Sequence, residues 1–521
     1  MKNPKEKHLN LTMAETAELF HVSAVTISNW VREGYLDLDD NRRVSQDSII
    51  RFKSKYAGKI KLQARANKSL KNDHDKEEVG LAIQKELLAD AFDDALGDRY
   101  EAMLSESYRN KEGIFYTPQD IVSDMMGSIE VNSKTLFLDP CCGSGNFLLK
   151  AVEMGVSPKH IYGYDTDPNA VKIARRRLKE KTGVEAVHVV CGDFLQRCHR
   201  LSKRFDMVFT NPPWGKKLPR AERMKHVREF EAGLSMDTSS LFVFAILKVL
   251  KPQGIAGLLL PDSFFRIASF EDVRKVVLQN TILQMKAHGK PFKTMNAACS
   301  LLFRNEAVEE GHLVKCHDHG KEFKRLQRSF LEMPRHILNY WTNDGEMAFI
   351  RQLMQQPYIT LKGYATWGLG IVTGNNAKMC KRSRHGGLVA IYRGKDILPG
   401  KLKAASLYID PKDFPRCQQV SSMALLKAPE KLIYRFISSD LVFYCDTHQR
   451  YILNSANMLV LDDRFPLSAK EVAEIMNSQL TNWLFKQLFN THRILRGDLE
   501  LLPIFTDLSL HRSFNLLDLN R

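Results

Sequence analysis

The chain has 521 residues, of which 44% are hydrophobic and 26% charged, and this length predicts two to four domains. A formal net charge of +16 favours a polyanionic partner, and we expect nucleic acid rather than an anionic membrane surface. Because the sequence has no run of about 18 apolar residues, we expect a cytoplasmic protein. The nine cysteines show no CxxC pair and no Cys/His ligand spacing, which argues against structural metal and a disulfide framework.

The first sixty residues contain two short amphipathic helical patterns that meet at a turn. In LTMAETAELFHVSAVTISNWVREGYL (11–36) the turn falls at positions 21–23, and the pattern resembles a helix-turn-helix. The second helix would offer to a DNA groove Ser23, Thr26, Ser28, Asn29 and Arg32. The segment NRRVSQDSIIRF then resembles the wing and helix of MerR-like or excisionase-like domains. A helical adaptor that touches no DNA is the alternative, and the charged residues 61–80 predict a linker.

A glycine-rich turn follows the first of four predicted strands in residues 81–310. The sequence TLFLDPCCGSGNFLL predicts an apolar strand over 135–138, then Asp139, the turn and a helix. Gly143 and Gly145 lack the Cβ atoms that would block close approach of a ligand to the turn and to the helix amino terminus. This pattern alone is weak because many tight turns use glycine, so the next strands must decide.

Three further predicted strands end on residues that suit a nucleoside. The segment YGYDTDP ends a strand at Asp165, 26 positions after Asp139. This is one strand-helix-strand repeat, so both carboxylates are expected at adjacent strand ends, where an acidic residue can bind ribose hydroxyls. The third strand ends at Asp193 and Phe194, a carboxylate for an adenine amino group and a ring for its face. The fourth, FDMVFTNPPW, ends at Asn211.

In this order FYTP, DPCCGSGNF, YDTDP, GDF and NPPW resemble the motifs of the gamma-class amino-methyltransferases of DNA, which include Type I modification subunits, Type IIG enzymes and TaqI-like adenine methyltransferases. The resemblance covers residues 82–305. It implies an α/β, Rossmann-like fold with a mostly parallel sheet and one reversed strand. It also implies methyl transfer from S-adenosylmethionine to adenine N6 in duplex DNA. The implied cofactor-binding residues are Thr117, Pro118, Asp139, Pro140, Gly143, Gly145, Asp165, Asp193 and Phe194.

The NPPW loop suits a planar amino group, whose nitrogen is a poor nucleophile because its lone pair is delocalised. If the Asn211 side-chain oxygen and the Pro212 carbonyl each accept one N–H, the nitrogen becomes more tetrahedral. Pro212 and Pro213 have restricted backbone angles and hold both acceptors in place. Trp214 offers a flat face to a base flipped out of the duplex. Phe292 lies in a segment that resembles the part of the family that packs on the other face of the flipped base. The alternative is that its ring only packs at the end of a strand.

Residues 311–521 change to short strands and basic turns, and they resemble the target-recognition domains of TaqI-like and Type IIG enzymes. We expect a cluster of phosphate-contacting residues there, formed by Lys378, Lys381, Arg382, Arg384, Arg393 and Lys395. Residues 468–489 predict one amphipathic helix. The predicted domains are a helix-turn-helix (1–60), a linker (61–80), a catalytic domain (81–310) and a target-recognition domain (311–521).

Several alternatives stay open. Cytosine-N4, RNA and protein-glutamine methyltransferases act on the same kind of amino group, although the last two need no DNA-recognition domain. A DNA-binding regulator with a degenerate core is the non-enzymatic alternative, against which the intact strand-end carboxylates argue. No convincing nuclease pattern precedes residue 80, so we expect no DNA cleavage by this chain and, in a restriction-modification system, a separate endonuclease. The oligomeric state and recognition sequence are not predicted.

Overall fold

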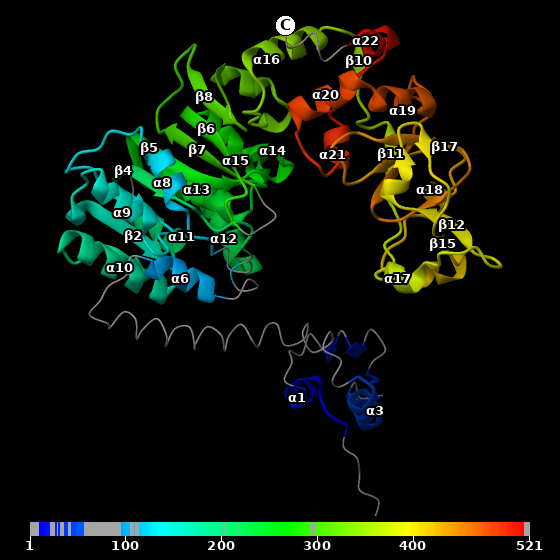
Figure 1. Cartoon of the computed structure of the whole chain (residues 1–521), viewed down its shortest axis with the longest axis horizontal. Helices are drawn as coiled ribbons and strands as arrows, with labels where there is room; N and C mark the ends of the chain where they lie inside the picture. The colour runs from blue at the N-terminus through cyan, green and yellow to red at the C-terminus, as the bar shows by residue number, and fades with distance from the viewer. Residues whose placement is uncertain are drawn as a thin grey trace, which may run out of the picture. The chain divides into compact units, whose positions relative to one another are not determined.

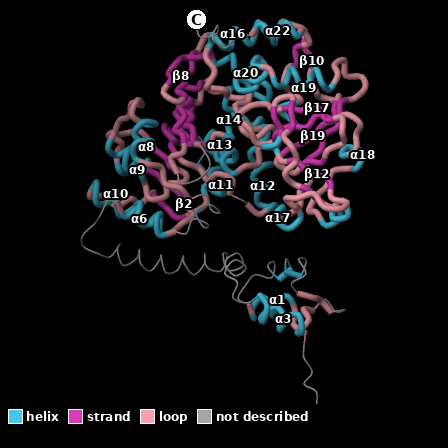
Figure 2. Tube along the Cα trace, turned by 45° about the vertical axis from the view of Figure 1, so that its right-hand side comes forward, coloured by secondary structure: helices cyan, strands magenta, loops and turns pink. Residues whose placement is uncertain are grey.

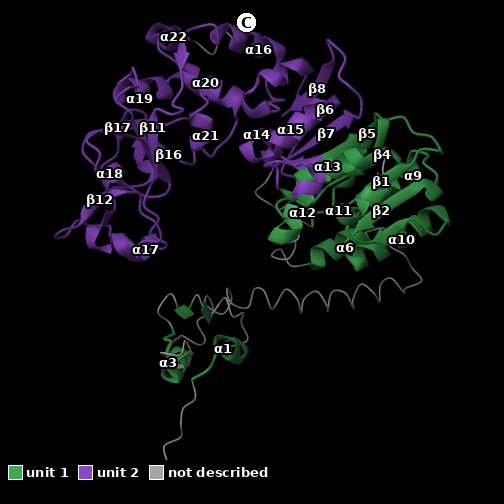
Figure 3. Ribbon diagram, turned by 180° about the vertical axis from the view of Figure 1, so that it is seen from behind, with its two compact units in different colours: residues 1–226, 237–258 green, residues 227–236, 259–521 purple. Residues whose placement is uncertain are grey.

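The structure is a computed structural model that divides by its contacts into two compact units (Figure 3). One unit comprises residues 1–226 and 237–258, and the other comprises residues 227–236 and 259–521. The described residues are 10–20, 27–28, 30–31, 36–39, 43–56, 95–104, 109, 114–201, 204–216, 218–292 and 297–514, except that the side chains of 53–56 are not described. Among them no helix is both long and apolar enough to cross a membrane.

The amino-terminal segment has a small aromatic core between α1 (Met13–Leu19) and α3 (Gln46–Tyr56). The ring centroids of Phe20 and Trp30 lie 5.7 Å apart and those of Trp30 and Phe52 lie 4.5 Å apart. The predicted turn at 21–23, most of the expected groove-facing residues and the linker 61–80 lie outside the described residues. The helix-turn-helix and its binding to DNA therefore stay predictions.

Nine strands form one sheet with the order β3-β2-β1-β4-β5-β7-β6-β8-β9. They are β1 (Phe137–Asp139), β2 (Ile161–Asp165), β3 (Val189–Cys191), β4 (Phe205–Thr210), β5 (Leu250–Pro261), β6 (Thr281–Gly289), β7 (Ala298–Arg304), β8 (Leu313–Asp318) and β9 (Lys321–Leu326). Strands β1 to β5 pair in parallel, and Asp139 lies opposite Gly163. The predicted α/β core and the predicted adjacent strand ends at Asp139 and Asp165 are therefore confirmed.

The sheet has one more reversed strand than the single one expected. Strand β7 runs antiparallel to β6, as expected, but β9 also runs antiparallel to β8. The β8–β9 hairpin closes through His319 and Gly320, both at positive φ, which is the backbone of a two-residue turn that matches strand twist. The sequence predicted this hairpin only weakly, because His-Gly is less typical of two-residue turns than Asn-Gly.

Helices cover both faces of the first five strands, with α8, α9 and α10 on one face and α11 and α13 on the other (Figures 1 and 2). The helices of this region are α6 (Leu96–Met103), α8 (Gln119–Met126), α9 (Asn146–Glu153), α10 (Pro168–Thr182), α11 (Phe194–Arg197), α12 (Arg220–Phe230), α13 (Thr238–Val249), α14 (Ser263–Arg266) and α15 (Glu271–Leu278). Helix α10 shows local sequence control, because Asp167 caps its start, Pro168 occupies its first turn and Gly183 ends it at φ 69°.

The carboxy-terminal part contains a four-stranded antiparallel sheet with the order β11-β19-β16-β17 and a three-stranded sheet with the order β15-β12-β18. Its strands are β10 (Tyr358–Ile359), β11 (Ala365–Leu369), β12 (Val389–Tyr392), β13 (Ile397–Leu398), β14 (Lys401–Leu402), β15 (Tyr408–Ile409), β16 (Lys431–Arg435), β17 (Phe443–Asp446), β18 (Tyr451–Ile452), β19 (Ala456–Leu461) and β20 (Ile504–Phe505). Its helices are α16 (Asp344–Leu353), α17 (Asn376–Met379), α18 (Met423–Leu426), α19 (Ala469–Asn477), α20 (Gln479–Leu488), α21 (Arg496–Leu499) and α22 (Leu508–Ser513).

The single helix predicted over 468–489 is wrong, because two helices, α19 and α20, occupy this range. Ser478 separates them with extended backbone angles, φ −67° and ψ 155°. Its hydroxyl accepts a hydrogen bond from the Thr481 N–H, so Ser478 is the amino-terminal cap of α20. Both helices bury one apolar face, and the apolar periodicity runs through the break.

Candidate active site

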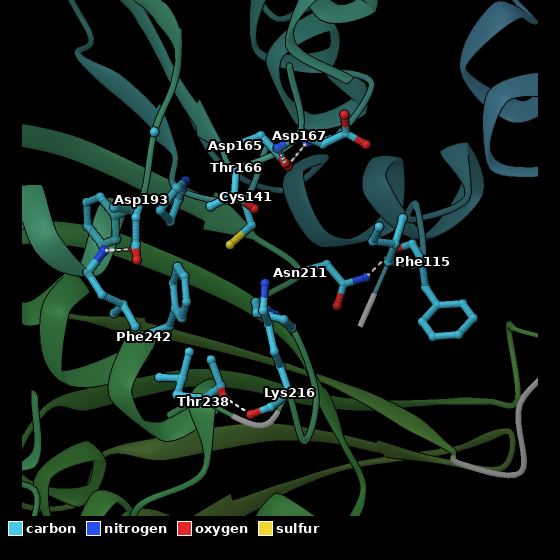
Figure 4. A pocket seen from close by; sticks show the side chains of 18 of the residues that line it. Phe115, Cys141, Asp165, Thr166, Asp167, Asp193, Asn211, Lys216, Thr238 and Phe242 are labelled. Carbon is cyan, nitrogen blue, oxygen red and sulfur yellow. Dashed lines mark hydrogen bonds between the residues drawn. The ribbon is translucent and has the colours of Figure 1, made fainter. Parts of the chain in front are cut away.

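A cavity of about 350 Å³ lies at the carboxyl ends of β1 to β4, within the first unit (Figure 4). The sequence-predicted residues that line it are Pro140, Gly143, Asp165, Asp193, Phe194, Asn211 and Pro213. A smaller adjoining space of about 20 Å³ shares Asn211 and Gly143 with it and adds Thr117 and Asp139. The fold thus brings together nine of the predicted residues, which come from five separate segments of the chain.

Five predicted site residues of the catalytic domain line neither space. Pro118 and Gly145 are the cap residues just before α8 and α9, and Pro212 is a buried residue of the NPPW loop. Trp214 is half-buried on the bend after the two prolines. Its stacking on a base stays a prediction, as does that of Phe292, which belongs to the second unit and is 8% exposed.

The glycine turn lets the backbone approach the cavity closely. Gly143 has φ 50°, and a Cβ atom placed on it would lie 2.6 Å from Cε1 of Tyr116. Gly145 has φ 93°, and its Cβ would lie 3.1 Å from that of Ala174. Glycine is favoured at both positions because the backbone has a positive φ and because a Cβ atom would be crowded. The turn therefore forms a cradle that a side chain at Gly143 would fill.

The strand-end carboxylates use part of their hydrogen-bonding capacity to shape the turn. Asp139 accepts from the Cys141 N–H at 3.0 Å. Asp165 accepts from the Gly143 N–H at 2.8 Å and from the Asp167 N–H at 2.9 Å, one on each oxygen. Since a carboxylate has about four lone-pair sites, Asp165 keeps acceptor capacity for ligand hydroxyl groups.

Two of these carboxyl groups hold protons more tightly than usual. Burial raises the pKa of Asp139 to about 7, and Asp165 contributes to this increase. Burial also raises the pKa of Asp165 to about 6, although the N–H groups of Asp167 and Gly143 and the charge of Lys216 oppose the shift. A cationic ligand would favour the ionised form of both groups, so the cavity suits a positively charged molecule.

Aromatic rings form the other walls. Phe194 and Phe242 stack at 5.9 Å between centroids, and both line the cavity. The buried hydroxyl of Tyr116 makes no hydrogen bond among the described residues, which leaves an unpartnered polar group on the cavity wall. The aromatic wall, the unpartnered Tyr116 hydroxyl and the spare acceptors of Asp165 together fit a nucleoside with ribose hydroxyls.

The Asn211 amide has a defined orientation. Its Nδ2 donates to the carbonyl oxygen of Phe115 at 2.8 Å. Because that carbonyl can only accept, the amide must present Nδ2 to it, and Oδ1 remains as the acceptor for a substrate. The loop is held beyond Asn211 as well, where the Thr238 hydroxyl donates to the Lys216 carbonyl at 2.7 Å.

Sequence reasoning missed several cavity residues. Tyr116 and Phe115 lie within the FYTP motif, so that motif was the available signal for them. Phe242 falls in the apolar run that starts at Leu241, and Thr238 falls in the short polar stretch before it, and neither position gave such a signal. Cys141 also lines the cavity, but burial raises the pKa of its thiol well above the usual range, so the reactive thiolate is scarce at neutral pH.

If S-adenosylmethionine binds in this cavity, as the sequence resemblance implies, Gly143→Ala should weaken its binding by about tenfold, or about 1.4 kcal/mol, because the new Cβ would displace Tyr116 from the cavity wall. Isothermal titration of the full chain measures this. Gly155→Ala is the matched control, because Gly155 also has positive φ (107°) but no atom within 4 Å of its added Cβ. Equal binding by the two variants would contradict a role for the turn.

The predicted basic cluster of the carboxy-terminal part is largely exposed. Five of its six members are exposed: Lys378, Lys381, Arg382, Arg384 and Lys395. Arg393 differs from the other members, because its guanidinium pairs with the buried Asp396 at 3.0 Å and donates to Ser406 Oγ at 2.7 Å. Any contact of this cluster with phosphate is therefore expected mainly from the five exposed members.

Comparison with known proteins gives two family matches. The N-6 DNA Methylase model matches residues 91–345, and the TaqI-like C-terminal specificity domain model matches residues 389–504. The Type II methyltransferase M.VspI of Vibrio sp. (strain 343) is 40% identical over 390 residues, which is 74% of this chain and 96% of that protein.

Two solved structures share the fold at low identity. The Type IIL restriction-modification enzyme MmeI in complex with DNA has a TM-score of 0.53 and 10% identity, over 79% of this chain and 71% of that one. The DrdV–DNA complex also has a TM-score of 0.53, with 12% identity over 96% of this chain and 64% of that one.

Proposed function

The chain belongs to the N-6 DNA methylase family and is a site-specific DNA methyltransferase of the restriction-modification kind, and from this we propose that it methylates the N6 amino group of adenine in duplex DNA with S-adenosylmethionine. The observation that carries the proposal is the Asn211 amide, whose Nδ2 is tied to Phe115 so that Oδ1 can accept from an amino group. Asn211 lines the cavity that suits a cationic nucleoside.

The cavity residues would hold the cofactor by complementary chemistry. Asp165 would accept from the ribose hydroxyls, and Asp193 and Phe194 would contact the adenine amino group and ring. Gly143 gives the backbone close access, and Thr117 lies in the adjoining space. When bound, S-adenosylmethionine supplies an electrophilic methyl group on a positively charged sulfur, a charge that suits the carboxylates of this cavity.

The NPPW loop would activate the target nitrogen by accepting hydrogen bonds from its two N–H groups. Asn211 Oδ1 would accept a hydrogen bond from one N–H and the Pro212 carbonyl from the other, so the nitrogen lone pair is less delocalised into the ring and can attack the methyl group. The bond from that carbon to sulfur breaks as the new bond forms, and the methylated nitrogen then releases one proton to water. The contact of Nδ2 with Phe115 fixes the Asn211 acceptor before the substrate arrives, so little reorganisation of this group is needed. The target adenine must leave the helix to reach this loop, and Trp214 would stack on the extruded base.

A TaqI-like specificity domain favours duplex DNA over RNA or protein as the substrate. The five exposed members of the basic cluster, of which only Lys395 lies within the matched residues 389–504, would contact phosphates. Neutralising Lys381, Arg382 and Arg384 together should weaken DNA binding at all sequences and lower its salt dependence, which filter binding over a salt series measures. A separate restriction endonuclease would be the functional partner.

The decisive experiment incubates the full chain with labelled cofactor and a set of duplex DNA, RNA and protein substrates. Label in N6-methyladenine of duplex DNA, lost in Asn211→Ala with cofactor binding retained, supports the proposal. Label in N4-methylcytosine, RNA or glutamine would overturn it in favour of an enzyme that uses the same loop on another amino group.

Affinity for S-adenosylmethionine should rise with pH. A cation favours the ionised carboxyl, so binding lowers the pKa of Asp165 from its unliganded value of about 6, and affinity increases as pH rises towards that value. Because binding below the pKa releases one proton, the dissociation constant should be about tenfold larger at pH 5 than at pH 7. Titration calorimetry across pH tests this. A flat profile from pH 5 to pH 7 would contradict it.

The unliganded protein should show the opposite trend in stability. The folded pKa of Asp139, about 7, lies above the ordinary value, so the folded state binds more protons than the unfolded state between these values. The stability contributed by this group is therefore present at low pH and is lost as pH rises through 7. Thermal unfolding with and without cofactor separates the two trends.

A further inference from the structure

Arg177 is a buried arginine on α10, close to the glycine turn but outside the cavity lining. It is 5% exposed. Its Nη1 donates to the Ser144 carbonyl at 2.8 Å and to Asn146 Oδ1 at 2.7 Å. Burying a guanidinium costs free energy unless its donors form hydrogen bonds. The contacts with Ser144 and Asn146 offset part of that cost.

Asn146 passes this constraint to another segment. Its Oδ1 accepts from Arg177, which fixes the amide so that Nδ2 faces the other way and donates to the Thr117 carbonyl at 2.8 Å. Asn146 is 8% exposed and lines the smaller space beside the main cavity. One amide therefore connects α10 with the FYTP segment.

The FYTP segment is held on both sides of Tyr116. The carbonyl of Thr117 accepts from Asn146, and the carbonyl of Phe115, two residues earlier, accepts from Asn211 Nδ2. The N–H of Tyr116 donates to Glu101 Oε2 at 3.0 Å. A continuous line of hydrogen bonds and one short stretch of backbone thus runs from Arg177 to the amide of Asn211.

We propose that Arg177 is a positioning residue for methyl transfer, which acts through Asn146 and residues 115–117 to hold the Asn211 amide in its productive orientation. This rests on the proposed function, in which Asn211 Oδ1 accepts from the target amino group. Small displacements of a positioned group have large kinetic effects, since a misplacement of about 1 Å can cost on the order of a hundredfold in rate.

The test uses three variants of the full chain and a matched control. Arg177→Met keeps the aliphatic stem without donors, Arg177→Lys keeps the charge with a single nitrogen, and Asn146→Ala cuts the line in its middle. Arg176→Met is the control, because Arg176 is the adjacent arginine on α10 and its partly exposed guanidinium pairs with Glu180 at 2.7 Å. Each variant is measured for single-turnover methylation at saturating cofactor and DNA, for cofactor affinity and for thermal stability.

We expect Arg177→Met and Asn146→Ala each to lower the single-turnover rate by about ten- to a hundredfold, with Arg177→Lys in between and Arg176→Met unchanged. Because both residues act on one line, the double variant Arg177→Met/Asn146→Ala should be no slower than Asn146→Ala alone. If Arg177→Met does not fold, Asn146→Ala carries the same test alone.

Loss of thermal stability without a change in single-turnover rate would overturn the proposal and reduce Arg177 to packing. Additive rate losses in the double variant would also overturn it. Failure of the underlying function looks different, because Asn211→Ala would then methylate as fast as the unaltered chain whatever Arg177 does.

Discussion

Asn211→Ala is expected to lower the single-turnover rate of methylation by about a hundredfold or more while leaving cofactor affinity nearly unchanged. Removing one preorganised group of this kind typically costs about 10²- to 10³-fold in rate. Asn211 lies at the end of β4 and borders the cavity through its amide, so its loss leaves the carboxylates at the ends of β1, β2 and β3 in place.

Asn211→Asp separates the two tasks of this side chain. Aspartate keeps an acceptor for the substrate but has no N–H for the Phe115 carbonyl, which lies 2.8 Å from Nδ2. Two acceptors at that distance repel each other, so the carboxylate is expected to turn away and the rate to fall almost as far as in Asn211→Ala. If Asn211→Asp keeps most of the activity, the contact with Phe115 does not orient the group.

The controls for both variants are the cofactor dissociation constant and the melting temperature. Unchanged values with a slow rate locate the defect at the target amino group. A large loss of cofactor affinity would instead place Asn211 in cofactor binding, and the assignment of its oxygen to the substrate would be wrong.

The strand-end residues could be predicted from the sequence because each depends on local chain geometry. Asp139 and Asp165 each follow an apolar strand, and parallel pairing of β1 with β2 brings their carboxyl ends together. The glycines of the turn carry their own conformational signature. Residues whose positions depend only on spacing within one strand-turn-helix unit can therefore be predicted from the sequence.

Residues that act across segments were harder to find. Phe242 reaches Phe194 from α13, and nothing in the spacing of α13 marks this contact. Arg177 is different, because its signal was present. The buried residues of α10 are Ala170, Val171, Ile173, Ala174, Arg177 and Leu178, so Arg177 lies in phase with the apolar face of the helix while its neighbour Arg176 does not.

Asp446→Asn should destabilise the carboxy-terminal sheets by about 3 to 5 kcal/mol, because it leaves a buried lysine without its counterion. Asp446 and Lys431 face each other on β17 and β16, their side chains are 0% exposed, and the charged atoms lie 2.9 Å apart. Burial alone would raise the pKa of Asp446, but Lys431 lowers it below its usual range. The pair therefore stabilises the fold at neutral pH, and this contribution is lost as the pH falls through the folded pKa.

The carboxylate also organises the turn after β17. It accepts from the Arg450 N–H at 2.7 Å, from Arg450 Nη1 at 2.9 Å and from the His448 N–H at 3.2 Å. An asparagine can replace at most one of these acceptor oxygens, so the turn that leads into β18 should loosen together with the sheet pairing.

Urea unfolding followed by tryptophan fluorescence measures the loss, and Asp440→Asn is the matched control. Asp440 pairs with Lys486 at 2.6 Å, but both side chains are about half exposed, and such surface pairs contribute about 0 to 1 kcal/mol. Adding Lys431→Met to Asp446→Asn removes the uncompensated charge and should recover part of the stability. If Asp446→Asn costs no more than Asp440→Asn, or if Lys431→Met worsens it further, the buried pair does not stabilise this part of the chain, and the turn contacts of Asp446 alone would have to explain why a carboxylate is buried there.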